Sequence, residues 1–249
     1  MFPALTLGAA SAAELLAWSP PGWGATLVVG LGNTILIALG AYAMGLAIGV
    51  MGAFGKLYGG PVTKDLLGVY TTLVRAVPEL VLLLLIYYAG KGAINAALVR
   101  AGFDTIEFSG VTAGIIVLGV VQGAYSTEVL RGAIISVPAG QIEAGRAMGM
   151  SAFRIARRIT LPLAMSSAVP GLANLWLNVT KDTALLAVIG FIELTKATSL
   201  AAATTKSFLT FYLAAGVLYL ALSLVSGVVF GRIEKWARKG QRNARGGAM

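Results

Sequence analysis

Long runs without a charged residue are the feature that most constrains how this chain folds. Residues 24–55 and 207–231 contain no Asp, Glu, Lys or Arg. A helix of about 20 apolar residues is long enough to cross the hydrocarbon core of a bilayer. The composition agrees, because 57% of the 249 residues are hydrophobic and only 12% are charged, whereas soluble domains carry about 25% charged residues. We therefore predict an all-α membrane protein.

Five transmembrane helices are predicted from such runs, although the second run contains Arg75 and Glu79. The segment 14–24, with two Trp and two adjacent Pro, is too short to span and is expected at the membrane interface. Residues 1–249 are expected to form a single transmembrane domain. The predicted spans lie inside 24–55, at about 66–90, at 108–127 with an extension to Leu130, from about Leu163 to Asp182, and at 207–231.

Lysine and arginine are distributed unequally between the two sides of the predicted bundle. Twelve lie in the connections after the first and third spans and in the tail 232–249, against four in the remaining connections. Positive residues accumulate on the cytoplasmic side of membrane proteins. We therefore expect the N-terminus outside, the C-terminus inside, and both the segment 140–160 and the basic tail in the cytoplasm. This asymmetry accounts for the net charge of +9 without a nucleic-acid partner.

The absence of cysteine and histidine excludes several chemistries. Disulfides, thiolate nucleophiles, histidine-based triads and nearly all zinc sites need these residues. The phosphate-binding pattern G-x-x-x-x-G-K-[ST] is absent as well. We therefore predict no metal, no cofactor and no ATP hydrolysis by this chain, which is not expected to be an enzyme.

The segment 140–160 combines arginines with small and apolar residues at helical spacing. Gly149 permits a tight turn, Ser151 is expected to cap a second short helix over 152–159, and Pro162 fits the first turn of the next span. Periodicity alone leaves two readings open, a helix docked in the groove of a partner protein or an amphipathic helix on the lipid surface. One face of the first helix is formed by Ile142, Gly145, Met148 and Gly149.

The spacing of this segment resembles a motif of known transporters. The pattern Glu143-Ala144-Gly145-x3-Gly149-x9-Ile159-x-Leu161-Pro162 is similar to the EAA motif of ABC importer permease subunits, with Gly145 where that family usually has a second alanine. The stretches 70–88, 123–151 and 161–190 resemble the polar amino acid permease family, including its histidine and basic amino acid branch.

This resemblance implies a type I ABC importer permease with a cytoplasmic coupling helix, in the bacterial inner membrane as a multi-pass protein. The coupling helix of such a subunit fits a cleft on an ATP-binding partner. The implied partners are an ABC ATPase homodimer that binds the ATP, a second permease copy or a sister permease, a periplasmic substrate-binding protein, an amino acid substrate and the lipid bilayer. The residues that it assigns to ATPase coupling are Glu143, Ala144, Gly145, Gly149, Ile159, Leu161 and Pro162.

Ionisable residues at membrane depth cost about 2.5–3.5 kcal/mol each on insertion scales, so they indicate a partner or a function. Arg75 and Glu79 are spaced i, i+4 around Pro78, and a continuous helix would place both on one face. They either neutralise each other or form a clamp, in which Arg75 binds a substrate carboxylate and Glu79 an ammonium or guanidinium group. In the basic amino acid branch an acidic residue follows this proline, and Glu79 resembles that choice.

Further polar residues are candidates for the substrate path. Glu128 lies near Arg131 at the cytoplasmic end of the third span, where a structural pair and a role at the inner gate both stay open. Asn174, Asn178 and Asp182 repeat every fourth residue and form a predicted polar stripe. That stripe serves either a substrate path or hydrogen bonds between helices.

From these observations we expect the transmembrane subunit of an ATP-driven amino acid importer, with arginine, lysine, histidine or ornithine as the favoured substrates. One alternative is an importer of another polar solute, such as an opine, an osmolyte, or a neutral or acidic amino acid. A secondary transporter or channel would be supported by an internal inverted repeat, which is not seen. A nonconducting scaffold explains neither the fixed motif spacing nor the intramembrane charges.

Overall fold

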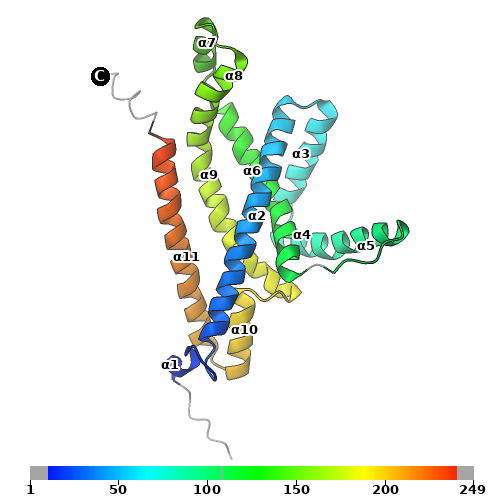
Figure 1. The fold of residues 1–249 in the computed structure, drawn as a ribbon, viewed down its shortest axis with the longest axis vertical. Coiled ribbons are helices and arrows are strands. Elements are labelled where there is room, and N and C mark those ends of the chain that lie inside the picture. Colours follow the sequence, from blue (N-terminus) through cyan, green and yellow to red (C-terminus); the bar gives the residue numbers. More distant parts are fainter. Residues whose placement is uncertain (1–10, 108, 240–249) are drawn as a thin grey trace, which may run out of the picture.

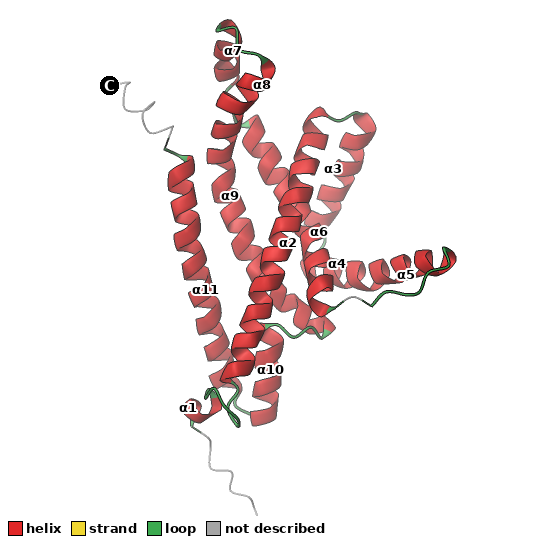
Figure 2. Ribbon diagram, viewed as in Figure 1, coloured by secondary structure: helices red, strands yellow, loops and turns green. Residues whose placement is uncertain are grey.

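The computed structural model describes residues 11–107 and 109–239, and these ranges contain helices and loops without any strand (Figures 1 and 2). Two π-helical turns, η1 (Ile86–Gly90) and η2 (Ala156–Thr160), and a 3-10 segment, η3 (Thr183–Ile189), connect helices end to end. The α-helices are α1 (Ala12–Leu15), α2 (Gly24–Tyr58), α3 (Pro61–Ala76), α4 (Glu79–Leu85), α5 (Lys91–Arg100), α6 (Gly110–Ile135), α7 (Ala139–Ala147), α8 (Ala152–Ile155), α9 (Leu161–Asp182), α10 (Leu194–Thr205) and α11 (Phe208–Ala237).

Four continuous helices are long and apolar enough to cross a membrane, namely Gly24–Tyr58, Glu79–Arg100, Gly110–Ile135 and Phe208–Ala237. A fifth span is obtained if the bent pair Ala152–Ile189 and Leu194–Thr205, which meet at 50°, crosses as one unit. The prediction of an all-α membrane protein is therefore confirmed. α2, α6 and α11 continue at their C-terminal ends past the charge-free runs, to Tyr58, Ile135 and Ala237.

The predicted second span, at about 66–90, is wrong in its limits. α3 ends at Ala76, Val77 and Pro78 adopt extended backbone angles, and the candidate span begins only at Glu79. Proline disfavours the helical conformation of the residue before it and has no N–H to donate. Arg75 and Glu79 therefore lie on different helices, and no ion pair joins them in the part of the chain that the structure describes.

The centre of the bundle is the contact between α2 and α6, where glycines of α2 allow a close approach of the two backbones. Gly45 faces Gln122, and Gly49 faces Ser126 so closely that a Cβ atom there would lie 2.9 Å from the Ser126 carbonyl carbon. Around this contact, buried apolar residues of α2, α6 and α9 form the main core cluster, with Ile37, Val117 and Val179 among its members.

The bend between η3 and α10 is held by a buried carboxylate that the sequence did not reveal. Gly190 turns the chain with φ = 88°, and Glu193 is fully buried. The Glu193 side chain caps α10 by accepting from the backbone N–H groups of Thr195 and Lys196, each at 2.8 Å. It also accepts from the Tyr219 hydroxyl of α11 at 3.2 Å. This network fixes α10 against α11 and thereby shapes the broken span.

The two ends of the bundle differ in charge. Figure 1 places the α2–α3 connection, α7 and the end of α11 at one end, and α1 and α10 at the other. The first group carries the lysine-rich and arginine-rich connections, as the grouping of positive residues predicts. Within the predicted tail 232–249, residues 232–239 are described and include an Arg238–Glu234 ion pair, whereas 240–249 lie outside the described residues.

Candidate functional site

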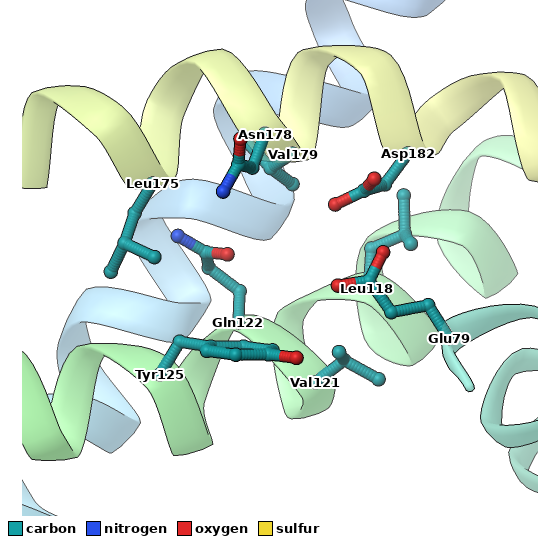
Figure 3. A pocket seen from close by; sticks show the side chains of 9 residues that line it. All are labelled: Glu79, Leu118, Val121, Gln122, Tyr125, Leu175, Asn178, Val179 and Asp182. Carbon is teal, nitrogen blue, oxygen red and sulfur yellow. The ribbon is translucent and has the colours of Figure 1, made fainter. Parts of the chain in front are cut away.

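A polar pocket lies inside the bundle where α4, α6 and α9 meet. Its volume is about 20 Å³, which holds a water molecule but not an amino acid. A solute that passes through this region must therefore displace side chains. The pocket is lined by Glu79, Leu118, Val121, Gln122, Tyr125, Leu175, Asn178, Val179 and Asp182 (Figure 3).

Two carboxylates from different helices converge in this pocket. Glu79 belongs to the first turn of α4, and Asp182 is the last residue of α9. Figure 3 shows the two carboxylates facing each other, with the Tyr125 hydroxyl on the same side of the pocket. Among the described residues, no lysine or arginine lines the pocket. Because two like charges repel strongly at low dielectric, either a proton or a bound cation must compensate them.

Two amide side chains complete the polar lining. Gln122 on α6 is only 4% exposed, and its Nε2 atom has no hydrogen-bond partner within the described ranges. Asn178 faces it from α9 (Figure 3). Leaving a buried donor unpaired costs free energy, so Gln122 is suited to meet a polar group of a ligand. Gln122 and Tyr125 line the pocket but were not predicted, although polar residues within a charge-free run were the available signal.

Two predicted substrate residues, Arg75 and Asn174, are exposed and do not line the pocket. Arg75 belongs to α3, which ends before the pocket. Asn174 is displaced because a four-residue spacing drifts by about 40° per step from the 3.6-residue helical repeat. The predicted polar stripe therefore reaches the pocket only at Asn178 and Asp182.

Glu128 belongs to a separate cluster of charges near the ends of α2, α3 and α6. Its Oε1 atom accepts from Lys56 Nζ at 2.5 Å, and its Oε2 atom accepts from Arg131 Nη2 at 2.9 Å. Lys56 Nζ also donates to Thr71 Oγ1 at 2.8 Å. The predicted pairing with Arg131 is confirmed, whereas Lys56 was not foreseen. Because two cations already neutralise Glu128, the structure favours its role in joining three helices.

The segment after α6 forms an elbow, α7 followed by α8, at the arginine-rich end of the bundle (Figure 1). α7 ends in a Schellman motif, in which the Met150 N–H donates to the Gly145 carbonyl at 3.0 Å and the Gly149 N–H donates to Arg146 at 2.9 Å. Gly149 has φ = 72°, so the predicted tight turn is confirmed. Ser151 precedes α8, but its side chain makes no capping hydrogen bond, and that prediction is wrong.

The predicted docking face of this elbow is divided between the interior and the surface. Gly145 is buried against Ile155 and Ile159 of the following helix. Met148 is 82% exposed, and Gly149 is exposed as well. The single face expected from helical periodicity is therefore wrong, because the turn at Gly149 folds part of it inward.

The remaining motif residues lie at the surface. Glu143 and Ala144 are exposed on α7. Leu161 is 57% exposed at the start of α9. Pro162 stands in the first turn of α9, as predicted. The exposed residues are available to a partner, while Gly145 and Ile159 hold the elbow together.

Taken together, a bundle with a broken helix, a polar pocket and a protruding elbow defines the membrane-embedded subunit of a transporter. Residues 45–239 match the family described as "Binding-protein-dependent transport system inner membrane component". The chain belongs to this family. It is thus a multi-pass membrane protein and the permease of an ABC importer, which is a transport component rather than an enzyme. Permeases of this family work with an ATPase and a substrate-binding protein.

Similar proteins narrow the class of solute to polar amino acids or opines. The chain is 38% identical to the nopaline transport system permease protein NocQ of Agrobacterium fabrum, over 92% of this chain and 98% of that protein. It is also 38% identical to the histidine/lysine/arginine/ornithine transport system permease protein HisQ of Salmonella typhimurium, over 90% of this chain and 98% of the relative. These two relatives are equally similar to the chain.

Solved structures agree with this fold. An amino acid ABC transporter crystallised with histidines superposes with a TM-score of 0.73 at 27% identity, over 86% of this chain and 94% of that chain. An inward-facing MetNI methionine ABC transporter superposes with a TM-score of 0.64 at 21% identity, over 90% of this chain and 98% of that chain. The predicted importer permease fold is therefore confirmed.

Proposed function

We propose that this chain is the permease subunit of an importer for basic amino acids, such as arginine, lysine, histidine or ornithine, in the bacterial inner membrane. The observation that carries this proposal is the meeting of Glu79 and Asp182 in a pocket whose described lining contains no cation. A substrate with a positive side chain supplies the missing charge at that point. A neutral amino acid brings no net charge to offset the two carboxylates.

The pocket offers complementary groups to both ends of such a substrate. Glu79 and Asp182 accept from the side-chain ammonium or guanidinium group, where charge-assisted hydrogen bonds are short and strong. Gln122 and Asn178 donate through their amides to the α-carboxylate, which replaces the role first assigned to Arg75. Since a cavity of about 20 Å³ is too small for an amino acid, substrate enters only when α4 and α9 move apart.

The elbow at Gly149 is, in this proposal, the coupling helix that faces the cytoplasm. Its exposed residues Glu143 and Ala144 contact a homodimer of ATPase subunits, which binds the ATP. A second permease copy or a sister permease completes the path, and a periplasmic binding protein delivers the amino acid. The N-terminus is outside and the C-terminus inside, in keeping with the positive charges gathered at one end of the bundle. The 249 residues act as one permease domain.

A second candidate substrate is an opine, because similar permeases serve nopaline and octopine transport systems. Uptake of labelled arginine into cells that express the whole transporter distinguishes the two. We expect excess lysine or ornithine to compete with arginine, while nopaline, octopine and glutamine compete much less. Stronger competition by an opine than by lysine would assign the opine instead, and an absence of ATP-dependent uptake of any of these solutes would refute the importer of basic amino acids.

A further inference from the structure

A second cavity, far larger than the pocket, opens at the end of the bundle that carries the elbow. Its volume is about 420 Å³. It lies where the last turns of α2 and α6 meet α8, η2 and the first turns of α9, and none of the pocket residues lines it. We call it the end groove. It is lined by Phe54, Tyr58, Ile134, Phe153, Ala156, Arg157, Thr160, Leu161 and Ala164.

The walls of the end groove are apolar, with one charge among them. Phe54 and Tyr58 form one wall, their ring centroids 5.8 Å apart, and Phe153 across the groove is 73% exposed. Among the described residues of the lining, Arg157 is the only charged one. It is exposed, and it makes no ion pair with any residue of 11–107 or 109–239. The groove thus pairs a large apolar surface with a single unneutralised cation.

The backbone at this point departs from regular α-helix. Residues 156–160 form the π-helical turn η2, and three of its members, Ala156, Arg157 and Thr160, belong to the groove lining. Such wide turns occur mostly as isolated features and frequently at functional sites. Here the turn brings a cation and a hydroxyl to the same rim.

We propose that the end groove binds an anionic phospholipid, with an acyl chain along its apolar walls and the phosphate at Arg157 and Thr160. The groove lies at the ends of three candidate spans, the depth at which acyl chains give way to headgroups. Basic pockets between transmembrane helices on the cytoplasmic side are suited to anionic headgroups. Charge decides against the C-terminal residues 240–249 as the occupant, because they contain Arg242 and Arg245 and no acid.

The test is native mass spectrometry of the assembled transporter, after exchange into detergent with phosphatidylglycerol or phosphatidylcholine. Arg157→Gln removes the proposed phosphate ligand. Arg158→Gln is the matched control, since it removes the same charge from a neighbouring residue outside the lining. Arg157→Lys keeps the charge. Ala156→Trp fills the groove without changing any charge.

We expect wild type to retain phosphatidylglycerol in preference to phosphatidylcholine, and Arg157→Gln to weaken that preference about fivefold, the effect of one basic residue near an anionic headgroup. Arg158→Gln and Arg157→Lys should keep the preference, and Ala156→Trp should lose the bound lipid. Equal loss in Arg157→Gln and Arg158→Gln would overturn the site in favour of general surface charge. Loss of a protein subunit in Ala156→Trp, with lipid retained, would overturn it in favour of a protein interface.

Discussion

Replacing Glu128 by Gln tests whether the charge cluster joins α2, α3 and α6. The change keeps the shape of the side chain but removes the charge that Lys56 and Arg131 share, at 2.5 and 2.9 Å. A hydrogen bond to a charged group contributes about 1.5–3 kcal/mol, and partial exposure reduces this through solvent screening. The side chains of Lys56 and Glu128 are 17% and 16% exposed, so we expect a loss of about 2 kcal/mol in the free energy of unfolding.

For a chain of this size that loss corresponds to a fall of about 4–8 °C in melting temperature. The melting temperature is measured by tryptophan fluorescence of the purified protein in detergent. Asp65→Asn is the control, because Asp65 is exposed and makes no ion pair in the described part of the chain. Adding Lys56→Met to Glu128→Gln should recover part of the loss, since the lysine is then no longer left unpaired. Ordinary surface substitutions shift the melting temperature by about 1 °C. If the melting temperatures of Glu128→Gln and Asp65→Asn differ by no more than this, the cluster contributes no stability and the reasoning is refuted.

Three further predictions concern helix packing, the turn at Gly149 and the orientation in the membrane. Gly49→Leu should abolish a stable α2–α6 contact because its Cβ would meet Ser126, and it should lower the yield of folded protein. Gly32→Leu on the same helix is the control, because a Cβ at Gly32 would meet no packed neighbour within 4 Å, and it should leave that yield unchanged. Gly149→Ala places a Cβ on a backbone with φ = 72°, which destabilises the turn by about 1 kcal/mol. The amount of ATPase that copurifies with the permease should fall about fivefold. Unchanged recovery would show that the turn is not needed for docking. Single cysteines at the exposed Ala139 and Ala203 should react with impermeant reagents only from the cytoplasm and only from the periplasm, respectively, and the reverse pattern would invert the proposed orientation.

The outline of the fold could be predicted from hydropathy alone. Charge-free runs located α2, α6 and α11, because each of these helices must be apolar along its length. The limits of the second span could not be found in this way, because the break at Pro78 depends on backbone sterics rather than on hydropathy. Likewise α10 was missed, since it lies between the fourth and fifth predicted spans and is capped by a buried carboxylate, Glu193.

The candidate site was predicted in part. Glu79, Asn178 and Asp182 were identified because polar groups are costly at membrane depth, and the structure brings these three together. Arg75 was assigned to the same face on the assumption of a continuous helix. Gln122 was visible in the sequence as a polar residue within a charge-free run, but only the packing of α6 against its neighbours shows that its amide is buried without a partner in the described part of the chain.

The central claim, that the pocket selects a cationic side chain, is tested most directly by transport into liposomes that contain the assembled transporter. Uptake of arginine and of glutamine, each delivered by a loaded binding protein, is compared for wild type, Glu79→Gln, Asp182→Asn and the control Asp65→Asn. We expect both pocket variants to lose arginine uptake about 10- to 100-fold relative to glutamine, the equivalent of one charge-assisted hydrogen bond, with the control unchanged. An equal loss of both substrates would contradict the account, because it would assign the two carboxylates to the stability of the bundle rather than to the charge of the substrate.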